Sequence, residues 1–194
     1  MKLSAGKVAG ALFFVAASQF VVGMMVAEAH YPGYSISANY ISDLGVGASA
    51  MIFNTSVFLL GLLILIGAYY LHRALNFRFL TLLLVLTAIG AMGVGVFTED
   101  FGQMHPLVSL IAFLFGGLSS VASFRLLKKP FSVIALILGF ISLGALVLFF
   151  GAIDLGLGVG GMERMIAYPI LLWGAGFGGY LIAYTEKAEV QKPQ

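Results

Sequence analysis

The chain has 194 residues, of which 61% are hydrophobic and 9% are charged, and its mean hydropathy is +1.06. Soluble domains carry about 25% charged residues, so this composition excludes a soluble globular protein and indicates an integral membrane protein. The net charge is only +2 and cysteine is absent, which excludes disulfides, thiolate metal sites and thiol nucleophiles.

Six apolar stretches follow one another, and each is close to the roughly 20 residues needed to cross about 30 Å of hydrocarbon. We expect an all-α fold, a single six-helix transmembrane domain that occupies residues 1–194. The expected helices cover residues 8–27, 49–71, 79–97, 107–127, 131–150 and 165–185. The first ends at a small-x-small pattern like a signal-peptide cleavage site, but its length favours a retained spanning helix.

Charged residues sort to opposite sides of this topology. Short cytoplasmic loops retain Lys and Arg, so we expect the side with most of the basic residues, and with it both termini, to be cytoplasmic. That side receives Lys2, Lys7, Arg73, Arg78, Arg125, Lys128, Lys129, Lys187 and Lys192. The opposite side receives Glu28, Asp43, Glu99, Asp100, Asp154 and Glu163, with His30, His105 and Arg164. The basic residues are scattered in short loops, which argues against nucleic-acid binding.

The centres of the expected helices contain no Asp, Glu, Lys or Arg. Pumps and proton-coupled carriers normally need ionisable groups at that depth, so these classes are disfavoured. The deepest polar side chains are Gln19, for which we expect an interhelical hydrogen bond, and Asn54, which we expect to form the floor of an outward cavity. Gly174 and Gly178 have the small-xxx-small spacing that lets helix backbones approach closely.

The candidate site residues lie at the outward ends of the helices and in the loops between them. A carboxylate beside an imidazole is a usual pair for general acid–base chemistry, so Asp43, Glu99 and His105 are the candidate catalytic residues. Arg164 is the lone outward base and the candidate contact for an anionic headgroup. The other candidate ligand-binding residues are Asn39, Ser42, Asn54 and Glu163.

A divalent metal is an alternative use of the two outward histidines. His30, His105 and a carboxylate would hold it and leave one position open for water, as in hydrolytic zinc sites. No spacing such as HExxH supports this interpretation, and the ligands would come from separate loops. The identity of any cofactor therefore stays open.

Four segments together carry a family resemblance: SANYISDLG, FNTSVFLLGLL, TED followed by MHPLVSLIAFLFGG, and GGMERMIAYPILLWGAGFGGYL. They resemble a widespread archaeal and bacterial family of six-helix membrane proteins of unknown function. In topology alone the chain is similar to eukaryotic six-helix proteins of GPI-anchor lipid remodelling. The resemblance implies a fold and a membrane location but no reaction. The positions that it marks as characteristic are Asn39, Ser42, Asp43, Asn54, Glu99, His105, Glu163 and Arg164.

These patterns favour an extracytoplasmic site in the cell membrane that binds, and in its enzymatic version modifies, a lipid headgroup or small polar ligand. As an enzyme the protein would be a membrane-embedded hydrolase or transferase acting on lipid. Two non-enzymatic interpretations stay open. One is an accessory or scaffold subunit, in a homo-oligomer or a larger membrane complex, and the other is a passive facilitator or channel.

Overall fold

The computed structural model describes the backbone of residues 4–190 and the side chains of residues 4–184. Within this range the chain forms helices and no strand, which confirms the all-α prediction. The α-helices are α1 (Ala5–His30), α2 (Ala50–Leu75), α3 (Arg78–Val96), α4 (Met104–Ser123), α5 (Phe131–Phe150) and α6 (Gly158–Val190). Three short 3-10 helices lie in the connections: η1 (Ser42–Gly45), η2 (Gly47–Ser49) and η3 (Glu99–Phe101).

Each of the six α-helices is long and apolar enough to cross a membrane. Large apolar side chains cover their outer faces, including Val147 at 72% exposed and Leu172 at 64% exposed. A continuous apolar exterior is unfavourable in water and suits hydrocarbon. The protein is therefore a multi-pass membrane protein.

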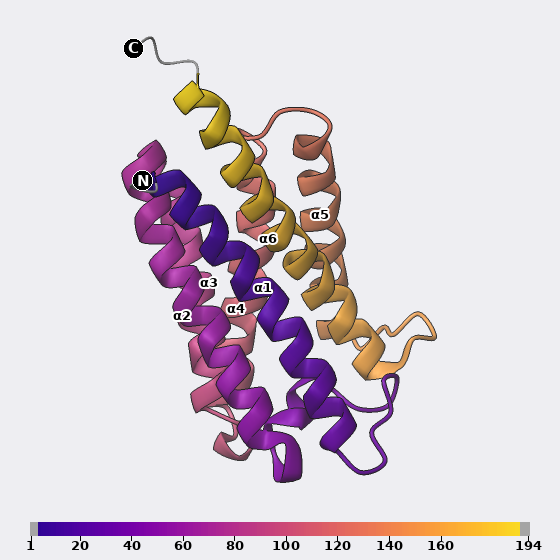
Figure 1. The fold of residues 1–194 in the computed structure, drawn as a ribbon. Helices are drawn as coiled ribbons and strands as arrows, with labels where there is room; N and C mark the ends of the chain where they lie inside the picture. The colour runs from indigo at the N-terminus through magenta and orange to yellow at the C-terminus, as the bar shows by residue number, and fades with distance from the viewer. Residues whose placement is uncertain (1–3, 191–194) are drawn as a thin grey trace.

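Five helices form a ring, and the remaining helix, α5, lies outside it. Around the ring, α1 packs against α2, α2 against α3, α3 against α4, α4 against α6, and α6 back against α1. Helix α5 packs against both α4 and α6. The start of α1 and the end of α6 lie at one end of the bundle, and the segment between α1 and α2 lies at the other (Figure 1). We call this second end the loop end.

Small residues set the closest helix crossings. A Cβ atom added to Gly10 would meet the Gly178 carbonyl oxygen, so α1 and α6 touch through their backbones. Farther along α1, Gln19 Nε2 donates to the Ser56 carbonyl oxygen at 3.0 Å and joins α1 to α2. The predicted interhelical hydrogen bond of Gln19 is confirmed.

Two predicted helix boundaries were wrong in ways that concern the site. Helix α6 begins at Gly158, not at residue 165, so Glu163 lies inside the helix and not at its start. The Gly160 N–H donates to the Ser37 carbonyl oxygen at 3.0 Å, so the loop between α1 and α2 satisfies a donor of the first turn of α6. Helix α4 begins at Met104 and so includes His105, which the prediction placed in a loop.

Candidate functional site

Arg164 ties the loop end together. Its side chain is 6% exposed, and Nη2 donates to the Glu28 carboxylate at 2.7 Å and to the Tyr34 hydroxyl oxygen at 2.6 Å. Nη1 donates to the carbonyl oxygens of Ile36 at 3.1 Å and Gly160 at 3.0 Å. Four of the five guanidinium hydrogens are thus directed at the protein itself.

Tyr34 extends this network into the loop between α1 and α2. Its hydroxyl donates to the Tyr40 carbonyl oxygen at 2.9 Å while it accepts from Arg164. Burial raises the pKa of Tyr34 above its usual 10.0, even though Arg164 acts in the opposite direction. The phenol therefore stays protonated and holds the loop backbone at the end of α6.

A second polar group gathers the expected catalytic acids. Asp43 Oδ2 accepts from Asn39 Nδ2 at 2.8 Å and from the Tyr40 N–H at 3.0 Å. Next to it, the Ser42 hydroxyl donates to Glu99 Oε1 at 2.6 Å and so links η1 to η3. The sequence places Asn39 and Asp43 four residues apart, but it does not predict that Ser42 would reach across to Glu99.

Glu99 is the electrostatic centre of this acid cluster. Burial is the largest cause that raises the pKa of Glu99 above its usual 4.5, and the nearby Asp43 carboxylate raises it further. The Ser42 hydroxyl and His105 act in the opposite direction. Asp43 and His105, the other two expected catalytic residues, therefore each lie close enough to Glu99 to act on its charge.

Glu163 joins the cluster from α6. Its side chain is 6% exposed, and Oε2 accepts from the Ile41 N–H. Glu163 and Arg164 are adjacent on one helix and so project about 100° apart. This divides their contacts, because Glu163 turns toward the ring interior and Arg164 toward α1 and the loop.

His105 lies in the first turn of α4 and is 8% exposed. Its Nδ1 contacts the Phe97 carbonyl oxygen at 2.7 Å, and its Nε2 contacts Ser109 Oγ at 3.3 Å. Sequence reasoning did not single out Ser109. A signal was available, because residues four apart on a helix face the same side.

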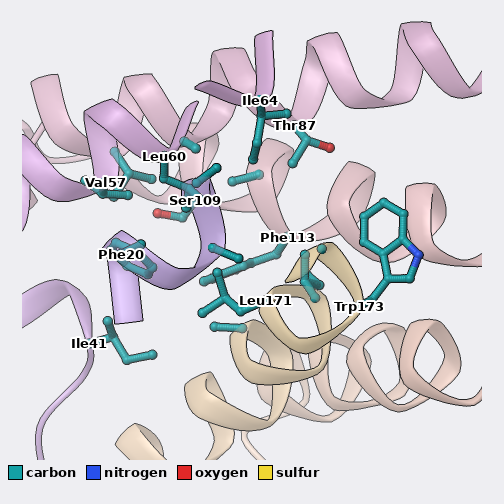
Figure 2. Close-up of a pocket in the computed structure, with 18 of the residues that line it drawn as sticks. Phe20, Ile41, Val57, Leu60, Ile64, Thr87, Ser109, Phe113, Leu171 and Trp173 are labelled. Carbon is teal, nitrogen blue, oxygen red and sulfur yellow. The ribbon is translucent and has the colours of Figure 1, made fainter. Parts of the chain in front are cut away.

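A cavity of about 100 Å³ runs through the ring of five helices (Figure 2). At the loop end its lining includes Ile41, Ser42 and Glu163, and at the other end it includes Trp173 and Phe177. The stretch of α6 from Glu163 to Phe177 is roughly 21 Å long at about 1.5 Å per residue. Apart from a few hydroxyls and Glu163, the lining is apolar, so Ser42 and Glu163 connect the acid cluster to one end of an apolar cavity.

The cavity closes before it reaches the opposite end of the bundle. Trp173 stacks on Phe177 with ring centroids 5.3 Å apart, and Phe177 is fully buried. Trp173 Nε1 donates to Ser123 Oγ at 3.0 Å, which fixes the indole in place. This aromatic end wall interrupts any polar path along the bundle axis.

Two predicted site residues have other contacts. Asn54 Nδ2 donates to the Gly45 carbonyl oxygen at 2.9 Å, and Asn54, which was predicted to form a cavity floor, is not among the residues that line this cavity. His30 is exposed at the end of α1, where Nδ1 contacts the Val26 carbonyl oxygen at 2.8 Å. Within the described residues, no group of three or more His, Asp or Glu side chains has metal-binding geometry. The metal hypothesis for His30 and His105 therefore has no geometric support.

The fold defines a class of protein: a six-helix membrane protein with a partly buried acid cluster at one end of an apolar cavity. The chain belongs to the family described as "Protein of unknown function (DUF998)", which it matches over residues 14–179. This match covers most of the chain and confirms the predicted kind of family, a six-helix membrane family of unknown function. No curated protein and no solved structure matches the chain.

Proposed function

We propose that this protein binds a single-chain amphiphile within the outer half of the membrane. The first carbons of the alkyl chain occupy the cavity, and the polar head lies among Ser42, Glu99 and Glu163. One observation carries the proposal: a polar cluster and a long apolar cavity share the lining residues Ser42 and Glu163. An amphiphile likewise joins a polar head to an apolar chain.

The dimensions favour one narrow chain. Pockets for drug-sized ligands usually measure 300–1,000 Å³, roughly three to ten times this cavity. An engineered apolar cavity of about 150 Å³ stays dry and binds benzene, so a void of this order accepts apolar atoms. The first carbons of an unbranched chain fit such a space, whereas a lipid with two chains has no room for the second.

The charges favour a headgroup that donates hydrogen bonds. Carboxylates only accept hydrogen bonds when ionised, and Asp43, Glu99 and Glu163 gather here. Arg164, the expected anion contact, directs four of its hydrogens to Glu28, Tyr34 and two carbonyl oxygens. An alcohol or an ammonium head is therefore the expected ligand, and a carboxylate or phosphate head is disfavoured.

A lateral route from the bilayer is also available. A groove of about 490 Å³ lies on the outside of the bundle between α1 and α6. The groove and the cavity share two lining residues, Ala17 and Leu171. Only a thin wall of side chains separates them, so a chain passes from lipid to cavity by a small displacement of these two residues.

The orientation of the site is part of the proposal. The acid cluster lies at the loop end, and the α2–α3 and α4–α5 connections lie at the opposite end of the bundle (Figure 1). The basic residues Arg73, Arg78 and Lys128 lie at or next to these two connections. The positive-inside rule then places the loop end on the extracytoplasmic face of the cell membrane. The ligand would enter from the outer leaflet.

The test uses the purified full chain in nanodiscs with a hexadecanol that carries a photoactivatable diazirine in its chain. We expect saturable crosslinking to α1 and α6 and competition by unlabelled hexadecanol or hexadecylamine. Palmitate and a two-chain phosphatidylcholine should compete at least tenfold less well. Crosslinking that does not saturate, or that palmitate displaces equally well, would overturn the proposal.

One glycine pair supplies matched variants for this test. Gly174 lines the cavity, and a Cβ added there would meet only the Ala17 side chain at 3.9 Å. Gly174→Leu therefore fills the cavity without a backbone collision, and we expect several-fold weaker crosslinking. Gly179 is exposed on the same helix with open space around it, so Gly179→Leu should leave crosslinking unchanged.

The two other interpretations are a passive facilitator and an accessory subunit. A passive facilitator needs a continuous polar path, and the wall formed by Trp173 and Phe177 opposes one. The role of accessory subunit stays a prediction, because it depends on a partner chain.

A further inference from the structure

Ser109 and His105 form a hydrogen-bonded pair with a defined direction. The Phe97 carbonyl oxygen only accepts, so the His105 Nδ1 that contacts it at 2.7 Å must carry the proton. In the neutral ring, Nε2 then has a free lone pair and accepts the hydroxyl hydrogen of Ser109 across 3.3 Å. This is the tautomer in which a histidine removes a proton from a serine.

Ser109 differs from other hydroxyl residues on these helices. Thr81 and Thr87 donate to the carbonyl oxygen four residues back, which is the usual arrangement within a helix. Ser109 pairs instead with an imidazole side chain four residues back, and it lines the cavity (Figure 2). The hydroxyl is thus beside a base and within reach of whatever occupies the cavity.

We propose that Ser109 is the nucleophile and His105 the general base for hydrolysis of a long-chain acyl ester, an inference that rests on the proposed binding function. Ser109 Oγ bonds to the ester carbonyl carbon and its proton passes to His105 Nε2. The alcohol leaves with that proton when the ester C–O bond breaks. Water then attacks the acyl-serine and gives a proton to His105, which returns it to Ser109 as the carboxylic acid departs.

The position of Ser109 suits an ester. Ser109 lies five positions after Met104, the first residue of α4, which places it roughly 7–8 Å into the helix. Ester carbonyls of lipids lie at the boundary between headgroup and acyl chains. With the acyl chain directed toward Trp173, the carbonyl carbon would lie beside Ser109 and the alcohol part beside Ser42 and Glu99.

Glu99 supports the same chemistry by charge. It is close enough to His105 for the two charges to interact, and a carboxylate stabilises the imidazolium that forms when His105 accepts a proton. The Phe97 carbonyl oxygen orients the ring from the other side. Glu99 is a positioning residue in this scheme, since it acts through His105.

The direct test is covalent labelling with hexadecyl fluorophosphonate. Its phosphorus forms a bond to an activated serine oxygen, fluoride leaves, and the serine proton passes to the base. We expect one label per chain, mapped by peptide mass spectrometry to Ser109, and loss of the label in Ser109→Ala and His105→Gln. Ser119→Ala is the matched control on the same helix, because the Ser119 hydroxyl is buried without a hydrogen-bond partner and does not line the cavity.

Turnover supplies the second readout. We expect release of palmitate from monopalmitoyl glycerol, and a fall of roughly 10³-fold or more in Ser109→Ala with the melting temperature unchanged. Label on Ser42 instead of Ser109 would overturn the assignment, as would labelling that persists in His105→Gln.

Failures of the two proposals are distinguishable. Saturable crosslinking of the diazirine hexadecanol without any fluorophosphonate label would leave the binding function intact and overturn the hydrolase. Gly174→Leu should lose labelling by the hexadecyl probe but keep labelling by a methyl-chain fluorophosphonate. If that variant loses both labels, the cavity does not act as the acyl-chain site.

Discussion

Arg164 on α6 donates to the carboxylate of Glu28 on α1 at 2.7 Å, with the two side chains 6% and 20% exposed. This ion pair joins the first and last helices at the loop end. The same guanidinium holds Tyr34 and the Ile36 carbonyl oxygen, so the long loop between α1 and α2 is anchored to α6. Because this loop carries Asp43, the pair sets the position of the acid cluster.

Arg164→Lys should destabilise the protein strongly. A lysine keeps the charge but cannot reproduce the planar fork of donors that reaches Glu28 and Tyr34 together. A hydrogen bond to a charged group contributes about 1.5–3 kcal/mol, so with more than one of them lost we expect the melting temperature in detergent to fall by roughly 10 °C. Arg78→Gln, an exposed site at the opposite end, should shift it by no more than about 1–2 °C. An unchanged melting temperature in Arg164→Lys would mean that the network does not anchor the loop.

Glu99→Gln should have an effect that depends on pH. Burial and Asp43 raise the pKa of Glu99 above 4.5, so the folded chain binds this proton more tightly than the unfolded chain. As the pH rises through the folded-state pKa, ionisation of Glu99 costs stability that the glutamine variant does not lose. The melting temperature of the variant minus that of the wild type should therefore increase from pH 4.5 upward.

Asp100→Asn is the control for this pH dependence, because it removes an exposed charge from the same turn. Thermal unfolding in detergent between pH 4.5 and 8 measures both differences. A Glu99→Gln difference that stays flat, or that declines with pH, would contradict the assigned direction of the shift.

The absence of cysteine allows a clean test of orientation. Ile153 is 49% exposed at the loop end, and Ala74 is exposed in the last turn of α2 at the opposite end. In intact cells, a membrane-impermeant maleimide should label Ile153→Cys and should label Ala74→Cys only after permeabilisation. The reverse pattern would place the acid cluster on the cytoplasmic side.

Much of the fold could be predicted because hydropathy is a local property. Each span has a mean hydropathy high enough to favour hydrocarbon over water, so the six spans and their order follow from the sequence. The positions of helix ends depend more on contacts with distant parts of the chain. The glycines around Gly160 have the composition of a loop, yet they form the first turn of α6 because loop backbone packs against them.

The site could be predicted only in part. Six acids lie at the loop end, but the sequence does not indicate which would pair with Arg164, and Glu28 is 136 residues away. Asn54 appeared to be a cavity floor by depth alone, whereas its side chain bonds to the Gly45 carbonyl oxygen. The cavity depends on space that side chains from five helices leave unfilled, and no single segment encodes that.

Gly160→Ala should separate the packing role of this glycine from its effect on helix propensity. An added Cβ would collide with the carbonyl oxygens of Asn39 and Ile36, so the loop must move away from α6. Overpacking of this kind costs about 1–3 kcal/mol, and for a chain of this length each kcal/mol lowers the melting temperature by roughly 2–4 °C. Asn39 also donates to Asp43, so its displacement disturbs the acid cluster.

Gly144→Ala is the matched control, since Gly144 is exposed on α5 and nothing lies within 4 Å of its added Cβ. Alanine is favoured over glycine in a helix by up to about 1 kcal/mol, so this variant should melt at the same temperature or slightly higher. Gly160→Ala should melt lower and react several-fold more slowly with hexadecyl fluorophosphonate. If both variants behave alike, the contact between the loop and α6 does not position the site.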